Sequence, residues 1–128
     1  KPFGLGVPAV GVPAPNSDWL GYAAMNTILD AGKPDAVVAT DDLLAFGVLR
    51  AADERGFTDI AVAGFNNSVR AAYQRPALTS VEIRPEELGY QAAHLLIASL
   101  AGDPQASNHR VIETSVIHRD ITLLRRRR

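Results

Sequence analysis

Residues 37–56 read VVATDDLLAFGVLRAADERG and join a short apolar run to an amphipathic one. The first run, Val37 to Ala39, is rich in β-branched residues and predicts a buried strand. The second, Asp42 to Arg55, carries apolar residues at helical spacing and stops at Gly56, which predicts a helix. A strand that passes directly into a helix is the repeating unit of a parallel sheet.

The same alternation of apolar strands and amphipathic helices runs along most of the chain. Proline and glycine mark the boundaries, and Asn16 or Ser17 can cap the first helix. Strands connected by crossover helices predict an α/β fold, with a mainly parallel sheet and helices on both of its faces. The expected strands are Val7–Val12, Asp35–Ala39, Asp59–Phe65, Ala77–Ile83 and Val111–Ile117; the expected helices are Asp18–Ala31, Asp42–Arg55 and Pro85–Leu100; a short polar segment runs through Tyr73.

The composition is that of a single globular domain of 128 residues with 47% hydrophobic content and a net charge of -1. Such a chain gives no electrostatic signal for nucleic-acid binding, and the one basic block, Arg125 to Arg128, is interpreted as a solvated tail. No apolar stretch approaches the roughly 20 residues that span a bilayer, so no membrane contact is expected. Because the chain starts at Lys1 rather than methionine, we expect a processed protein or a piece of a longer one.

Motifs of enzymatic catalysis are missing from the sequence. It contains no P-loop, no G-x-S-x-G elbow and no H-E-x-x-H helix. The absence of cysteine excludes disulfides, thiolate metal sites and a cysteine nucleophile. We therefore expect no enzymatic activity, no cofactor and no metal site. The three histidines lack metal-ligand spacing and are interpreted as surface or half-buried residues: His94, His109 and His118.

Polar residues follow two of the expected strands, at Thr40–Asp42 and at Gly64–Asn67. Ligands of open parallel sheets bind beyond the carboxyl ends of the strands, where helix N-termini point their free amides outward. Asp42, at the helix start, is expected to accept those amide hydrogen bonds. Asp41 is not needed for that role, and its carboxylate either faces donors on a ligand or is a solvated loop acid.

Five motifs occur in order between Pro34 and Leu100: PDA, DLLAFG, GFNN, PALTSV and ELGYQAAHLL. Together they resemble the second half of the effector-binding core of the lactose-repressor/galactose-repressor (LacI/GalR) family of transcriptional regulators. The resemblance extends over about residues 18–119. It implies the second lobe of a type I periplasmic-binding-protein-like fold, in a cytoplasmic regulator. Periplasmic solute-binding proteins of transporters share this fold and remain the alternative, while an enzyme of doubly wound fold is the third class.

The resemblance also implies parts that this sequence does not contain. In the family, a helix-turn-helix DNA reader and a first lobe precede the second lobe, and the effector binds between the lobes. We therefore expect residues 1–119 to form the second lobe, with the helix at 85–101 belonging to the absent first lobe and 120–128 as a basic tail. Operator DNA would be bound only through the absent N-terminal domain.

Four ligand-binding positions follow from the resemblance. Asp41 stands where the family makes its first polar contact with the effector, which we expect to be a sugar or a related metabolite. Asn66 stands where the family usually has aspartate; an amide offers donors as well as an acceptor, which changes the preference for an ordinary pyranose. Asn16 occupies the place of a ring-stacking aromatic residue. Trp19, two residues before Gly21, either reaches the cleft or packs within the lobe.

A homodimer is expected through the helix that begins at Asp42. Its inner stripe leaves Leu43, Phe46 and Ala51 as a second apolar side that one sheet cannot cover. The family resemblance implies pairing through the same helix. The predicted interface residues are Leu43, Phe46, Arg50 and Tyr73.

The helix at Pro85–Leu100 carries a further apolar stripe of Leu88, Ala92, Leu95 and Leu96. Burial of large apolar side chains stabilises by about 1.5 to 3 kcal/mol each, so exposure of the whole stripe is unfavourable. The apolar stripe can be covered in two ways, by the same chain or by a second copy of it. Either the helix folds back over the sheet or it covers a neighbouring copy, and the proline at its start favours the neighbour.

Overall fold

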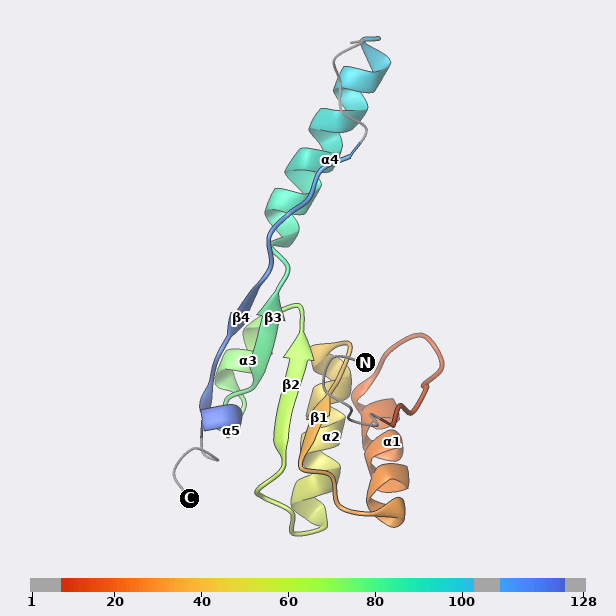
Figure 1. Ribbon diagram of the computed structural model, residues 1–128, viewed down its shortest axis with the longest axis vertical. Helices are drawn as coiled ribbons and strands as arrows, with labels where there is room; N and C mark the ends of the chain where they lie inside the picture. Colours follow the sequence, from red (N-terminus) through yellow and green to blue (C-terminus); the bar gives the residue numbers. More distant parts are fainter. Residues whose placement is uncertain (1–7, 103–108, 124–128) are drawn as a thin grey trace.

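The computed structural model describes residues 8–102 and 109–123 (Figure 1). Its four strands form one sheet in the order β1-β2-β3-β4, with β1, β2 and β3 parallel and β4 antiparallel to β3. The predicted α/β fold with a mainly parallel sheet is confirmed. The elements are α1 (Asp18–Ala31), β1 (Ala36–Val38), α2 (Asp42–Glu54), β2 (Ala61–Phe65), α3 (Val69–Tyr73), β3 (Thr79–Glu82), α4 (Pro85–Leu100), β4 (Ser115–Ile117) and α5 (Asp120–Leu123).

The two faces of the sheet differ in how they are covered. Val62 and Ser80 are fully buried on the face that packs against α2. Side chains alternate between faces along a strand, so Thr79 points to the opposite face, where its hydroxyl lies 2.7 Å from that of Thr122 in α5. The rest of this second face is open, since Val38 and Val116 are 76% and 51% exposed.

Helices α1 and α2 pack closely because two glycines permit it. A Cβ on Gly21 would overlap the backbone carbonyl of Leu44, and one on Gly47 would overlap the backbone of Asp18 and Tyr22. The contact buries Met25 of α1 in the core of the lobe. The two N-termini therefore lie at the same end of the lobe, which is also the carboxyl end of the strands.

Several boundaries differ from the sequence prediction. The strand expected at Val7–Val12 is wrong for residues 8–12, which are irregular, while Val7 lies outside the described residues. Pro8 and Pro13 lack the amide hydrogen that a strand donates to its neighbour, and no described strand pairs with the free edge of β1. The last strand starts at Ser115 rather than at residue 111.

The polar segment through Tyr73 contains a short helix, α3, whose Ala71 is buried. The expected basic tail begins with another short helix, α5, and its Ile121 belongs to the hydrophobic core. The tail prediction missed this helix because an apolar residue next to an arginine block carries no periodic signal. The block at residues 125–128 lies outside the described residues.

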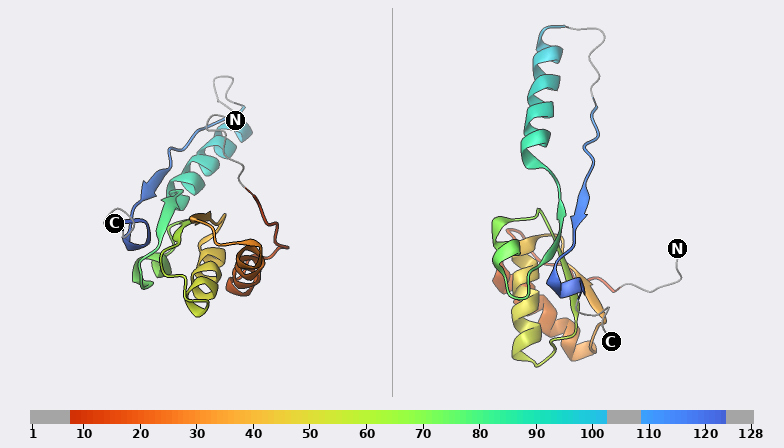
Figure 2. Two further views of the ribbon diagram at one scale, coloured as in Figure 1. Left: turned by 60° about the horizontal axis from the view of Figure 1, so that its bottom comes forward. Right: turned by 90° about the vertical axis from the view of Figure 1, so that its left-hand side faces the viewer.

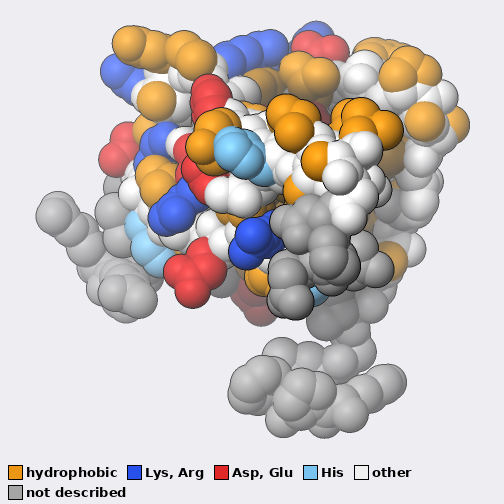
Figure 3. Space-filling view, turned by 90° about the horizontal axis from the view of Figure 1, so that it is seen from above, with side chains coloured by type: hydrophobic (Ala, Val, Ile, Leu, Met, Phe, Trp, Pro, Cys, Tyr) orange, Lys and Arg blue, Asp and Glu red, His pale blue; other side chains and the backbone are white. Residues whose placement is uncertain are grey.

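Helix α4 extends away from the lobe, and the segment that leads back to β4 runs beside it (Figures 1 and 2). None of its residues is buried, and Leu88 and Leu96 are 51% and 60% exposed. Seen from this end, several groups of hydrophobic side chains lie at the surface (Figure 3). The helix does not fold back over the sheet. Within the described ranges, no helix is long and apolar enough to cross a membrane.

Replacement of Gly47 by alanine is expected to lower the free energy of unfolding by about 1 to 3 kcal/mol, because the new methyl group meets the backbone of α1. Chemical denaturation measures the change. Gly89→Ala is the matched control: Gly89 is also helical, but a Cβ there meets nothing within 4 Å. That variant should gain up to about 1 kcal/mol from helix propensity. Equal effects at the two sites would contradict the close packing of α1 on α2.

Candidate functional site

The ends of β1 and β2 bring Asp41 and Asn66 together. The Nδ2 of Asn66 donates a hydrogen bond of 2.9 Å to Oδ2 of Asp41. The backbone N–H of Asn66 donates to the carbonyl of Val81 in β3, also at 2.9 Å, which fixes the loop beside the third strand. Two of the predicted ligand-binding residues thus form one polar pair at the carboxyl edge of the sheet.

The capping role predicted for Asp42 belongs to Asp41 instead. Asp41, expected to be free of the helix, is the N-cap of α2, and its Oδ1 accepts the amide of Leu43 at 2.7 Å. Asp42, expected to cap the helix, is the first helical residue and turns its side chain inward. The reason is geometric: an N-cap residue has extended backbone, as Asp41 does, and its carboxylate can reach the amide two residues further on.

Asp42 is only 2% exposed and joins three segments. Its Oδ1 accepts the hydroxyl of Ser80 in β3, and its Oδ2 accepts the amide of Ser68 at the start of α3, both at 2.7 Å. A Cβ at Gly64 would overlap Oδ1 of Asp42, so the close approach of β2 requires glycine. The buried carboxylate is thereby satisfied by donors from two neighbouring strand ends.

Asn67 is a functional candidate that the sequence analysis missed. Its Nδ2 donates to Oε2 of Glu82 and its Oδ1 accepts from Nη2 of Arg119, each at 2.6 Å. Asn66 and Asn67 have φ of 92° and 47°, a left-handed conformation that asparagine tolerates better than most residues. The adjacent asparagines after an apolar strand were the one available signal, but their partners lie far along the chain.

The hydrogen bond from Asn67 is the main reason that the pKa of Glu82 lies below its ordinary value, and the backbone N–H of Arg84 lowers the pKa further. A carboxyl group with a lowered pKa stabilises the folded state when it is ionised. This contribution is fully present above the ordinary pKa of glutamate and is lost as the pH falls through the lowered value. The contact between Asn67 and Glu82 therefore weakens in acid.

The other two predicted ligand-binding residues lie apart from this pair in the contacts of the described chain. Trp19 is 64% exposed and stacks on Tyr22, with ring centroids 5.5 Å apart. Trp19 lies on the outer surface of α1. Packing within the lobe, one of the two predicted alternatives, is therefore wrong. Asn16 is an exposed residue of the loop before α1.

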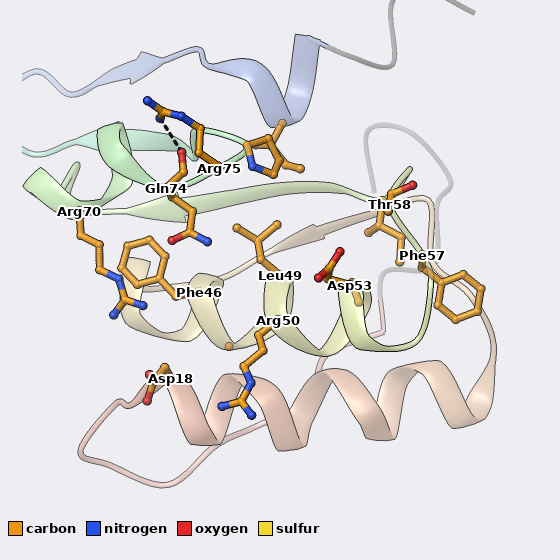
Figure 4. Close-up of a pocket in the computed structure, with 15 residues that line it drawn as sticks. Asp18, Phe46, Leu49, Arg50, Asp53, Phe57, Thr58, Arg70, Gln74 and Arg75 are labelled. Carbon is orange, nitrogen blue, oxygen red and sulfur yellow. Dashed lines mark hydrogen bonds between the residues drawn. The ribbon is translucent and has the colours of Figure 1, made fainter.

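A cavity of about 360 Å³ lies elsewhere, along the side of α2 (Figure 4). Phe46, Leu49 and Arg50 line it from α2, and Arg70 and Gln74 line it from the α3 region. Neither Asp41 nor Asn66 contributes to it. Figure 4 shows the lining side chains spread along the helix as a groove. Of the residues predicted for dimerisation, Phe46 and Arg50 line the groove, whereas Leu43 and Tyr73 do not.

One part of the predicted dimer surface is wrong. Phe46 is 4% exposed, because the guanidinium of Arg70 lies 4.3 Å above its ring, and Ala51 is fully buried. The second apolar side of α2 is thus largely covered within the same chain. Leu43, Arg50 and Tyr73 are exposed.

The strand-end pair offers hydrogen-bond acceptors and donors but no catalytic arrangement. Asp41 and Asn66 contain no nucleophile paired with a base. In the part of the chain that the structure describes, no group of three histidine, cysteine, aspartate or glutamate side chains could hold a metal ion. Polar side chains at the carboxyl ends of parallel strands define a binding lobe, with hydrogen bonding as its chemistry.

The chain belongs to the periplasmic binding protein-like domain family, whose model matches residues 5–122. It is 38% identical to the transcriptional regulator CelR of Thermobifida fusca over 104 residues, which cover 78% of this chain and 31% of CelR. It is 36% identical to the transcriptional repressor PurR of Erwinia tasmaniensis over 103 residues, or 77% of this chain and 30% of PurR. The chain thus spans about a third of the length of these relatives.

Solved structures give the same result. A complex of CelR with cellobiose superposes with a TM-score of 0.76 at 33% identity, covering 82% of this chain and 33% of that one. A regulatory protein of the LacI family from Chloroflexus aggregans matches with a TM-score of 0.76 at 30% identity, over 83% of this chain and 40% of that one. These relatives are transcriptional regulators rather than enzymes. The chain corresponds to part of the effector-binding domain of a LacI-type regulator.

Replacement of Asp42 by alanine is expected to cost about 2 to 4 kcal/mol of stability, because the buried donors of Ser68 and Ser80 lose their acceptor. Asp41→Ala, one residue earlier, should cost only the value of an N-cap, about 0.5 to 2 kcal/mol. Urea denaturation of the two variants measures both. A larger loss for Asp41→Ala would show that the roles assigned to these acids are wrong.

Proposed function

We propose that this chain is the part of a LacI-type regulator that senses a small molecule, a sugar or a related metabolite with several hydroxyl groups. The observation that carries the proposal is the hydrogen-bonded pair of Asp41 and Asn66 at two neighbouring strand ends. Binding there biases the arrangement of two lobes, and an operator-binding domain responds to that arrangement. Such a regulator acts in the cytoplasm.

The chemistry of the pair suits hydroxyl groups. Each oxygen of Asp41 accepts one hydrogen bond within the chain, and a carboxylate oxygen has room for a second. The carbonyl of the Asn66 amide adds another acceptor. Two similar structures hold sugars: the CelR complex contains cellobiose, and a LacI-family regulator from Enterococcus faecium, 28% identical with a TM-score of 0.73, contains ribose. Cellobiose and ribose are therefore the first sugars to test for binding.

Helix α4 forms an arm that extends from the lobe. Its exposure is evidence for a second lobe that forms the other wall of the site. A helix with no buried residue, and with Leu88 and Leu96 more than half exposed, needs a partner surface. We propose that this surface belongs to the other lobe. The effector site between the lobes would then be completed by residues beyond Asp41 and Asn66, and Trp19 and Asn16 remain candidates at its rim.

We further propose that the regulator is a homodimer that pairs through α2 and α3. Leu43 and Tyr73 are 44% and 74% exposed on these helices, and the groove of about 360 Å³ lies beside α2. Exposed large apolar side chains on two helices are typical of an interface. Arg50, held by Glu54 at 2.8 Å, adds a charged group to the same surface.

The effector site is tested by Asp41→Asn in the full-length regulator. Asparagine caps a helix as well as aspartate does, so the fold should be kept while the negative charge is lost. A hydrogen bond to a charged group is worth about 1.5 to 3 kcal/mol, so sugar affinity should fall by roughly 10- to 150-fold in calorimetry. Asp53→Asn, an exposed acid at the other end of α2, is the control. Equal affinities in the two variants would place the effector elsewhere.

The dimer surface is tested by Tyr73→Glu in sedimentation velocity. Phe46 is unsuitable because it is buried, and its replacement would disturb folding as well as association. A carboxylate in an apolar interface should raise the dimer dissociation constant by at least about tenfold. Thr27→Glu, on the exposed side of α1, should leave sedimentation unchanged. If Tyr73→Glu also sediments as the parent protein does, the pairing surface lies on another face.

A further inference from the structure

The side chain of Asn67 joins three segments that are distant in sequence. It lies in the loop after β2, next to Asn66. Its amide nitrogen binds Glu82 at the end of β3, and its amide oxygen binds Arg119 just after β4, both at 2.6 Å. Its backbone N–H also donates to the hydroxyl of Ser80 at 2.9 Å. Each polar group of the side chain therefore has a partner on a different segment of the chain.

Two of these partners mark the connections between the lobe and α4. The chain leaves the lobe after Glu82, whose Oε1 accepts the amide of Arg84 at 2.9 Å, and Arg84 turns into α4 with φ of 51°. The chain returns through β4 and reaches Arg119, which donates to the carbonyl of Leu78 at 2.7 Å. Figure 1 shows these two connections running side by side between the lobe and the arm. Asn67 is the residue that contacts both of their anchors.

The same side chain is connected to the strand-end pair. Ser80 receives the amide of Asn67 and in turn donates to the buried carboxylate of Asp42. Asn66, the immediate neighbour of Asn67, shares its left-handed backbone conformation and binds Asp41. Positive φ at two successive residues leaves the backbone of this loop few alternative conformations, so a displacement of the Asn67 backbone is passed on to Asn66.

We infer that Asn67 is a positioning residue that couples the Asp41–Asn66 pair to both connections between the lobe and α4. This inference rests on the proposed function, since the coupling serves effector sensing. When the strand-end loop shifts, Glu82 and Arg119 move with it, and the direction of the arm changes. Asn67 itself contacts no effector in this arrangement; it acts through Asn66 on one side and through the two anchors on the other.

Asn67 donates to Glu82 and accepts from Arg119, so the donor and acceptor between Asn67 and Glu82 can be exchanged by two substitutions that leave the net charge unchanged. In Asn67→Asp the new carboxylate still accepts from Arg119, but it faces the carboxylate of Glu82, so this one contact becomes repulsive. Adding Glu82→Gln supplies an amide donor to the new carboxylate and restores the hydrogen bond with reversed direction. The double variant has the same net charge as the parent chain. A merely space-filling role for Asn67 would respond to neither exchange.

Amide hydrogen exchange, followed by NMR on the full chain without effector or operator, is the first measurement. Asn67→Asp should speed exchange of the Arg84 and Asn66 amides by about tenfold, while amides of α1 and α2 stay as they were. The double variant should return both rates to within about twofold of the parent. If Asn67→Asp folds poorly, Glu82→Ala replaces it and removes the same contact from the other side; because it also removes the acceptor of the Arg84 amide, the Asn66 amide is then the readout, and unchanged exchange there would overturn the inference. Unchanged rates at Arg84, or no recovery in the double variant, would overturn the inference.

The second measurement uses the full-length regulator and the sugar that binds it best. Asn67→Asp should still bind operator DNA, but the change in operator affinity on adding the sugar should shrink by at least about fivefold, and the double variant should recover it. A full sugar response in Asn67→Asp would overturn the coupling. Failure of any sugar to bind the parent protein would instead refute the proposed effector class, and the exchange experiment would still decide the role of Asn67.

Discussion

The buried carboxylate of Asp42 is the constraint on which the strand-end geometry depends. A carboxyl group that is 2% exposed is tolerated only when hydrogen-bond partners surround it, and the hydroxyl of Ser80 and the amide of Ser68 supply them. Those donors come from β3 and from the loop after β2, while Asp42 itself follows β1. One side chain therefore holds together the start of α2, the loop after β2 and strand β3, and the positions of Asp41 and Asn66 follow from it because both residues lie next to these contacts.

This arrangement explains why the pair at the surface is ordered without being buried. The side chain of Asp41 is held by the hydrogen bond that it accepts from the amide of Leu43. Asn66 is held by the hydrogen bond from its backbone N–H to the carbonyl of Val81. A ligand that meets two preoriented groups loses less conformational entropy on binding than one that must order them. Gly64 belongs to the same arrangement, because any side chain there would displace Asp42. Glycine is required at position 64 by close packing and not by a turn conformation.

Helices α1, α2 and α4 were predictable because their signals are local: apolar spacing, a capping serine or acid, and proline at the start of α4. The strand-end location of the site followed from the alternation of strands and helices. The assignment of Asp41 and Asp42 failed because it depends on which residue adopts extended backbone, a difference of one position. Phe46 and Asn67 were misjudged or missed for another reason, since the residues that cover or bind them are far away in sequence, 52 positions for Arg119 and Asn67.

The free energies of the hydrogen bonds made by Asn67 suit a conformational switch better than a rigid connection. Each hydrogen bond within a folded chain contributes only about 0.5 to 1.5 kcal/mol net, and somewhat more when one partner is charged. Coupling between two binding sites typically needs about 1 to 3 kcal/mol. The contact of Asn67 with Glu82 and its contact with Arg119 are each a hydrogen bond to a charged group, worth about 1.5 to 3 kcal/mol, so a change in one of them matches the energy of such coupling. Under the proposed coupling, a ligand that moves the loop of Asn66 would shift the connections to α4, while the close packing of α1 on α2 is kept because a glycine contact fixes it.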